Sequence, residues 1–143
     1  MKKILAFALA VAVPGIAVAQ TAIVVHRDPG CGCCAKWAAM AQRELKRPVR
    51  MIDNPQRATL AHKAGVPATL GSCHTAIIDG YAIEGHVPFA DIKRLLATKP
   101  RGVRGLAVGG MPMGSPGMEV PGRAERYAVM AFGAREPRVF ARH

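Results

Sequence analysis

Three of the four cysteines in this 143-residue chain lie within four residues, in the segment Cys31-Gly32-Cys33-Cys34. The fourth, Cys73, is followed directly by His74. A group of thiols this dense is typical of a soft-metal site, a redox site, or both. We therefore expect the rest of the chain to fold so that Cys73 is brought to the other three cysteines.

The N-terminal residues 1–19 have the layout of a secretory signal peptide: two lysines, a short apolar stretch and a small-residue triplet that ends at Ala19. We expect cleavage between Ala19 and Gln20 and export to the periplasm, which leaves residues 20–143 as one soluble metal-binding domain. The apolar stretch is too short to span a bilayer, and no later segment is long enough for a transmembrane helix.

The chain carries a formal net charge of +11, with 20 Lys and Arg residues against 9 Asp and Glu residues. These basic residues are spread along the sequence, and aromatic residues make up only 5% of it. A nucleic-acid-binding face is therefore disfavoured, because such a face groups its basic side chains together. The charge indicates a solvated basic surface instead.

Strands and helices are predicted to alternate early in residues 20–143. Residues 22–26 are rich in β-branched side chains and precede an Asp-Pro-Gly turn, which is typical of a buried strand. Residues 34–45 are helix formers with apolar side chains at helical spacing. Residues 49–52 predict a second strand and residues 56–64 a second helix, which the Asp-Asn-Pro segment 53–55 is expected to cap.

A hairpin and a third helix are predicted next. Residues 75–78 and 81–87 have strand-like composition and are separated by Asp79-Gly80, a strong hairpin signal. A helix is expected to start at Pro88 and to end near Lys99. Together these elements predict an α/β protein with a thioredoxin-like fold, in which a parallel strand pair and its crossover helix precede the hairpin.

The cysteines can be placed on this predicted fold. Cys31 and Cys34 form a Cys-x-x-Cys pair between the first strand and the first helix, where the positive end of a helix favours thiolates. Cys73 and His74 enter the third strand, in a loop where thioredoxin-like folds usually carry a cis-proline and this chain has none. We expect both residues to face Cys31, Cys33 and Cys34.

Soft thiolate donors select Cu(I), zinc or iron–sulfur clusters. A structural zinc site usually combines two separated Cys-x-x-Cys halves, and the spacing here differs from the common iron–sulfur patterns. Crowded thiolates favour bridging, in which one sulfur binds two Cu(I) ions. A structural disulfide, for instance between Cys31 and Cys34, is the alternative, because an exported protein meets an oxidising compartment.

Two histidines are further candidates. His74 is about as well placed to support a ligand by hydrogen bonding as to bind a metal itself. For His86 we favour a polar side chain on an edge strand over a metal ligand.

The segment after Pro100 extends beyond a minimal thioredoxin-like domain. A Gly- and Pro-rich loop at residues 109–118 carries three methionines whose thioether sulfurs are potential Cu(I) donors, and we favour packing or a lid over ligation. These are Met111, Met113 and Met118. Residues 127–132 and 139–141 predict a terminal hairpin that extends the sheet.

Five segments carry a resemblance to a known family. They read DPGCGCCAKW, GVPATLGSCHTA, GYAIEGHVP, DIKRLLA and GLAVGGMPMGSPGME. From about residue 23 to residue 140 the chain resembles the periplasmic metal-binding family that includes the CopG-type copper-resistance proteins. This resemblance implies a thioredoxin-like fold, export to the periplasm and a copper site on thiols, with Cys31, Cys33, Cys34 and Cys73 as the ligands.

Three functions remain open at this stage. The first is a periplasmic protein of copper resistance that holds Cu(I) on four cysteines, with possible thiol or copper redox activity as a copper oxidoreductase. The second is a thiol–disulfide oxidoreductase in which Cys31 attacks and Cys34 resolves. The third is a passive copper buffer or chaperone. The expected partners are copper ions and other periplasmic copper-handling proteins, without nucleic acid.

Overall fold

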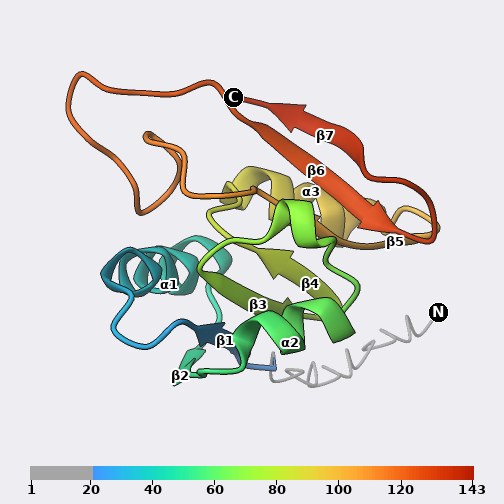
Figure 1. Ribbon diagram of the computed structural model, residues 1–143, viewed down its shortest axis with the longest axis horizontal. Helices are drawn as coiled ribbons and strands as arrows, with labels where there is room; N and C mark the ends of the chain where they lie inside the picture. The colour runs from blue at the N-terminus through green and yellow to red at the C-terminus, as the bar shows by residue number, and fades with distance from the viewer. Residues whose placement is uncertain (1–20) are drawn as a thin grey trace, which may run out of the picture.

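A computed structural model describes residues 21–143, so the predicted signal peptide and its cleavage site near Ala19 and Gln20 lie outside the described residues. Within residues 21–143 the chain forms one mixed seven-stranded sheet and three α-helices (Figure 1). None of the described helices has the length and apolar character needed to cross a membrane. The predicted α/β class is confirmed, while the thioredoxin-like assignment stays a prediction.

Strands and helices alternate as far as β3, the strand β4 and the helix α3 come next, and the last three elements are strands. In chain order they are β1 (Ile23–Arg27), α1 (Gly32–Leu45), β2 (Val49–Asp53), α2 (Arg57–Lys63), the 3-10 helix η1 (Ala68–Leu70), β3 (His74–Ile78), β4 (Tyr81–Glu84), α3 (Phe89–Thr98), β5 (Val103–Ala107), β6 (Ala128–Gly133) and β7 (Arg138–Arg142). The sheet order is β2-β1-β3-β4-β5-β6-β7. β1 pairs with β2 in parallel, as predicted for two strands joined by a crossover helix, and the structure also pairs β1 with β3 antiparallel.

The two faces of the sheet are covered by different helices. Alternate strand residues such as Ile83 and Leu106 pack with Trp37 of α1 and Leu95 of α3 in the larger apolar core. Residues of the opposite parity, such as Phe132, pack against α2 in a smaller core. The cysteine-bearing start of α1 is therefore anchored on the larger core.

The first helix begins two residues earlier than predicted, inside the cysteine motif. Cys31 is its N-cap, and the Cys31 Sγ accepts a hydrogen bond from the backbone N–H of Cys34 at 3.3 Å. The second helix is one residue shorter than predicted at each end, because Gln56 is its N-cap and Ala64 its C-cap. Asp53, which was expected to help cap this helix, is the last residue of β2. Asn54 still contributes, since its Oδ1 accepts from the N–H of Gln56 at 2.9 Å.

The predicted hairpin of β3 and β4 is confirmed, with Asp79 and Gly80 both at positive φ in its turn. β4 ends at Glu84, before the predicted residue 87, because Gly85 adopts a φ of +70° and turns the chain. The edge-strand interpretation of His86 is wrong: His86 follows β4, and β4 pairs with β3 on one side and β5 on the other.

β5 is a strand that sequence reasoning missed, and it joins the predicted terminal hairpin of β6 and β7 to the rest of the sheet. Gly105 lies at its centre, opposite Ala82 of β4 and beside the ring of Phe132. A glycine within a strand weakens the sequence signal for that strand. The predicted extension of the sheet by the hairpin is confirmed.

We predict that Gly105→Ala strongly destabilises the protein. A Cβ at residue 105 would overlap the carbonyl oxygen of Ala82 and approach the Phe132 ring, and overpacking of this kind costs about 1–3 kcal/mol or more. Thermal unfolding followed by circular dichroism measures the loss. The matched control is Gly109→Ala, whose Cβ would make only ordinary van der Waals contacts near Leu70. Equal midpoints for the two variants would contradict this account of β5.

Candidate metal centre

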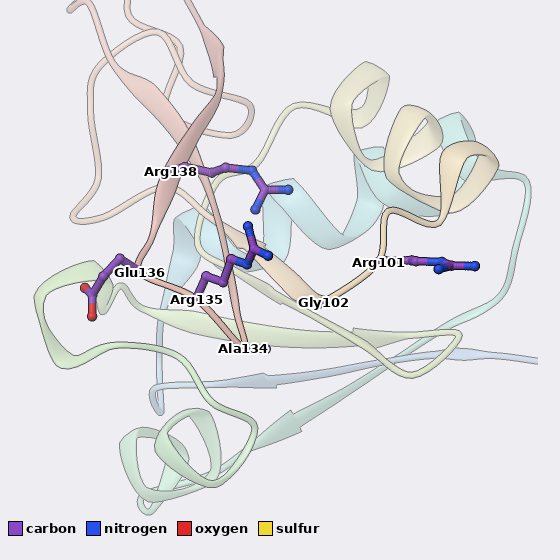
Figure 2. A pocket seen from close by; sticks show the side chains of 6 residues that line it. All are labelled: Arg101, Gly102, Ala134, Arg135, Glu136 and Arg138. Carbon is purple, nitrogen blue, oxygen red and sulfur yellow. The ribbon is translucent and has the colours of Figure 1, made fainter.

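A hollow of about 730 Å³ lies at the turn between β6 and β7, away from the cysteines (Figure 2). Its lining residues are Arg101, Gly102, Ala134, Arg135, Glu136 and Arg138. The lining offers no thiol or imidazole for a soft metal, so the chemistry predicted from the sequence has to be sought elsewhere in the chain.

The cysteines meet because β1 and β3 are antiparallel neighbours. Arg27 at the end of β1 lies opposite His74 at the start of β3, so the segments that continue from these strand ends run side by side. The backbone N–H of Asp28 donates to the carbonyl of Cys73 at 3.0 Å, which extends the pairing by one residue. The turn before α1 therefore faces Cys73.

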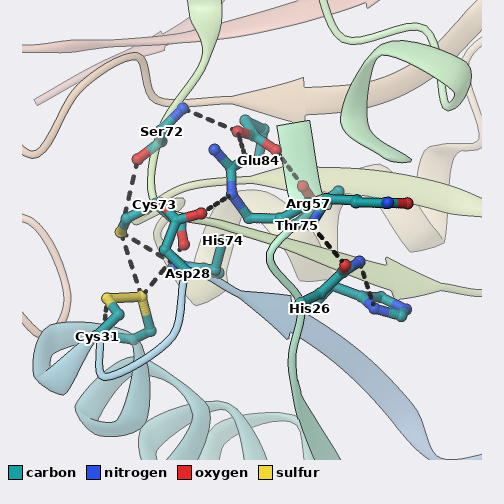
Figure 3. A network of polar contacts seen from close by, with 12 residues as sticks. His26, Asp28, Cys31, Arg57, Ser72, Cys73, His74, Thr75 and Glu84 are labelled. Atoms are coloured by element: carbon teal, nitrogen blue, oxygen red, sulfur yellow. Dashed lines mark hydrogen bonds and ion pairs between the residues drawn. A yellow bond between two sulfur atoms is a disulfide. The ribbon is translucent and has the colours of Figure 1, made fainter. Parts of the chain in front are cut away.

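The sulfur atoms of all four cysteines lie within 4.8 Å of one another. Cys31 and Cys34 form a disulfide in this structure. The Sγ of Cys73 is 3.3 Å from the Sγ of Cys34, which belongs to the disulfide beside it (Figure 3). It is 3.9 Å from the Sγ of Cys33, and the Cys31 and Cys33 sulfurs are 3.4 Å apart. The predicted proximity of Cys73 to the other cysteines is confirmed, while metal ligation by the four stays a prediction.

Burial sets the protonation of Cys73. Cys34 is fully buried and Cys73 is 8% exposed, whereas Cys33 is half-buried. Burial, assisted by the neighbouring Cys33, raises the pKa of Cys73 to about 12. Cys73 is thus a neutral thiol at physiological pH, and a metal ion that binds it would have to displace the proton.

Two histidines adjoin Cys73 and form a second group of potential ligands with it. The Nε2 of His86 is 3.2 Å and the Nδ1 of His74 is 3.6 Å from the Cys73 sulfur. The donor atoms of Cys73, His74 and His86 all lie within 4.8 Å of one another. Both histidines are fully buried. The distances confirm the prediction that His74 lies near the cysteines, and they place His86 there as well.

Both imidazoles are held in their neutral form. Burial lowers the pKa of His86 and lowers that of His74 to about 3, where the neighbouring His86 contributes as well. The Nδ1 of His86 lies 2.8 Å from the carbonyl oxygen of Pro116 and therefore carries its proton, which leaves Nε2 as an acceptor towards Cys73. The Nε2 of His74 is buried without a hydrogen-bond partner.

Sequence reasoning placed too little weight on His86. No periodic pattern distinguishes a histidine that follows a strand and turns back to the site. The signal was Gly85, whose N–H donates to the carbonyl of His74 at 2.9 Å and thereby folds residue 86 towards Cys73. Glycine adopts positive φ more readily than other residues, so a glycine directly before a histidine is the sequence signal that could have pointed to His86.

The methionine loop lies over the cysteine turn. Gly117 packs against the backbone of Cys33 and Trp37, at a distance where a side chain would not fit easily. The Sδ of Met111 is 4.0 Å from the Sγ of Cys33, and Met111 is 51% exposed. Met113 and Met118 are half-buried further along the loop. Met111 is thus the thioether that the structure brings into contact with a cysteine.

Comparison with known proteins gives two related findings. Two solved structures of a copper resistance protein copG, Form 1 and Form 2, are each 39% identical to this chain, with a TM-score of 0.78. Each alignment covers 87% of this chain and 98% of the other. A family model described as "Protein of unknown function, DUF411" matches residues 70–118. Among curated proteins there is no significant match.

We predict that the two thiols left free by the disulfide differ strongly in reactivity. In metal-free protein, iodoacetamide at pH 8 should alkylate Cys33 at least about tenfold faster than Cys73, because a pKa near 12 leaves little thiolate at Cys73. Peptide mapping by mass spectrometry measures the two rates. In urea the rates should become similar. Equal rates in the folded protein would show that burial does not control the Cys73 thiol.

Proposed function

The chain belongs to the family of CopG-type copper-resistance proteins, and from this premise we propose that it is a periplasmic copper-binding protein that holds Cu(I) on Cys31, Cys33, Cys34 and Cys73. The observation that supports this proposal most directly is the approach of the four sulfur atoms to within 4.8 Å of one another. At such separations one thiolate can bridge two metal ions. Copper is here the bound cargo of the protein.

The chemistry of the donors supports Cu(I) as the metal. Thiolate and thioether sulfur are soft ligands of the kind that Cu(I) prefers. The thioether of Met111 lies near Cys33 on its exposed side, and two neutral imidazoles lie near Cys73 on its buried side. A cysteine that binds Cu(I) does so as a thiolate, and the neutral thioether and imidazoles beside the cysteines add donors without adding charge.

The Cys31–Cys34 disulfide connects copper binding to thiol oxidation and reduction in this proposal. With Cys31 and Cys34 joined, two of the four sulfurs are no longer thiolate ligands, so reduction is required before the full site can form. Closing the disulfide releases two electrons and two protons from the two thiols. Two Cu(II) ions accept the two electrons and become two Cu(I) ions, so this pair can couple thiol oxidation to copper reduction.

A thiol–disulfide oxidoreductase acting on other proteins is the second candidate function. The Cys31–Cys34 disulfide at the start of α1 favours it, because this is the spacing of a redox-active pair. Cys33 has no role in a two-thiol exchange, whereas it is a ligand in the copper site. The fate of Cys33 therefore separates the two functions. A passive copper buffer or chaperone differs from the first function only in lacking turnover.

The cellular setting belongs to the same proposal. Residues 1–19 are proposed to be the signal peptide that exports the protein to the periplasm, where other copper-handling proteins would deliver or accept the ion. Without Lys2 and Lys3 of the proposed signal peptide, the formal net charge falls from +11 to +9, so copper approaches a basic protein. Transfer from a partner by ligand exchange avoids the electrostatic cost that a free cation would meet at a basic surface.

We predict that Cys33→Ser lowers the amount of Cu(I) bound under reducing conditions, because one of four sulfurs is lost. Reversible formation of the Cys31–Cys34 disulfide should persist. His74→Ala should have a smaller effect, a loss of about 10–100-fold in affinity, as expected for a group that supports a ligand. Anaerobic titration with a Cu(I) chelator measures both.

The control is His62→Ala, which removes an exposed potential donor on α2 and should leave copper binding unchanged. Copper tolerance of cells that carry the variants provides a second readout. If Cys33→Ser bound copper as the parent does, the four-sulfur site would be wrong and the dithiol oxidoreductase would become the better assignment.

We also predict strong selectivity for Cu(I) over Zn(II). Reduced protein loaded with Zn(II) should release it when Cu(I) is added in the stoichiometry that fills the site, since soft sulfur ligands favour copper. Zinc release can be followed with a colorimetric zinc indicator. Retention of zinc against an excess of Cu(I) would contradict the assignment of the metal.

A further inference from the structure

A buried ion pair lies beside the cysteines without touching a sulfur atom. Glu84 of β4 has no exposed surface, and Arg57 of α2 is 7% exposed. The Nη1 of Arg57 is 2.9 Å from the Oε1 of Glu84, and its Nε is 2.8 Å from the Oδ1 of Asp28. Burying two charges is costly, and an apolar pair of similar volume often serves stability as well or better. The contacts of this pair therefore point to a role other than stability.

The Glu84 carboxylate holds both flanks of the segment that carries Cys73. Its Oε1 accepts from the backbone N–H of Ser72 at 2.8 Å, and its Oε2 accepts from the hydroxyl of Thr75 at 2.6 Å (Figure 3). Cys73 and His74 lie between these two residues in the chain. One carboxylate thus fixes the residue before the thiol and the residue after the imidazole.

Arg57 connects the same carboxylate to the other cysteine segment. Its second partner, Asp28, donates its backbone N–H to the carbonyl of Cys73 at 3.0 Å. The carbonyl of Asp28 accepts from the N–H of Cys31 at 3.1 Å, where the cysteine turn begins. The planar guanidinium has the fork that can bond two carboxylates at once in fixed directions. A continuous chain of contacts therefore joins the two segments.

We propose that Arg57 and Glu84 are positioning residues that set the distance between Cys73 and the Cys31–Cys34 turn. We call this pair and its contacts with Asp28, Ser72 and Thr75 the clamp. The clamp fixes sulfur-to-sulfur geometry whether or not a metal is present. Its consequence for copper affinity rests on the proposed function.

The clamp can be tested without metal by the ease with which Cys34 and Cys73 form a disulfide. In a Cys31→Ser/Cys33→Ser background these are the two remaining thiols, and their sulfurs are 3.3 Å apart in the parent. Glutathione disulfide oxidises the pair and is itself reduced to two glutathione thiols. The equilibrium gives the effective concentration of one thiol at the other, which reports their positioning.

Glu84→Gln should lower this effective concentration by at least about tenfold, because the buried guanidinium loses its fully buried counter-charge and the two segments separate. Arg57→Lys should give an intermediate value, since an ammonium is a point charge and lacks the fork needed to hold Asp28 and Glu84 together. A core variant with a similar fall in thermal midpoint separates this positioning role from mere support of the fold.

The matched control is Ile92→Val, a change in the buried core of α3 away from the clamp. It destabilises the protein but should leave the effective concentration within about twofold of the parent, since the cysteine segments are untouched. The clamp is rejected if Glu84→Gln keeps the parent value, or if Ile92→Val loses as much at a similar fall in thermal midpoint. Should Glu84→Gln not fold, Thr75→Val removes one contact of the carboxylate, and a parent value there also rejects it.

Copper titration of Glu84→Gln with all four cysteines present separates this inference from the proposed function. The expected loss in Cu(I) affinity is about 10–100-fold, as for other groups that hold ligands in place. If the parent protein bound no copper, the proposed function would fail, and the disulfide equilibrium would still decide the clamp. If the parent bound copper and Glu84→Gln matched it, the clamp would not control the metal site.

Discussion

The antiparallel pairing of β1 with β3 is the constraint on which the site depends. It sets Arg27 opposite His74, and thus joins the end of one strand to the start of another across 47 residues of chain. Helix α1 then begins within the cysteine motif, so three sulfurs are fixed relative to a rigid helix. A slip of one residue in this register would send His74 to the opposite face of the sheet.

Burial also shapes the site, because it disfavours the charged forms of the titratable side chains around Cys73. The thiol of Cys73 and the imidazoles of His74 and His86 are all pushed towards their neutral forms by desolvation. A hard, strongly hydrated cation gains little from such a site. A soft, weakly hydrated ion can exchange its ligands for sulfur and nitrogen without a large electrostatic attraction. The same neutrality lets three potential donors share a small volume without mutual repulsion.

Much of the architecture could be predicted from the sequence, because the signals were local. The Asp79-Gly80 turn and the Cys-x-x-Cys pair at a helix start each depend on a few neighbouring residues. β5 was missed because Gly105 sits where a strand would normally carry a side chain. The link from Arg57 to Glu84 could not be predicted, since the two residues are 27 positions apart and only the folded sheet brings them together.

The chain reversal at Gly85 has a consequence for how this protein can change over evolutionary time. Glu84 on one side holds the segment that carries Cys73, and His86 on the other side touches the Cys73 sulfur. Between them, a side chain at residue 85 would meet the Val108 carbonyl and Ser72 at 2.5–2.6 Å. Residues 84–86 therefore depend on one another for their function. Inserting or deleting one residue there would remove both the Glu84 contact with Ser72 and the His86 contact with Cys73. Related proteins are therefore expected to keep all three residues or to lose the site as a whole.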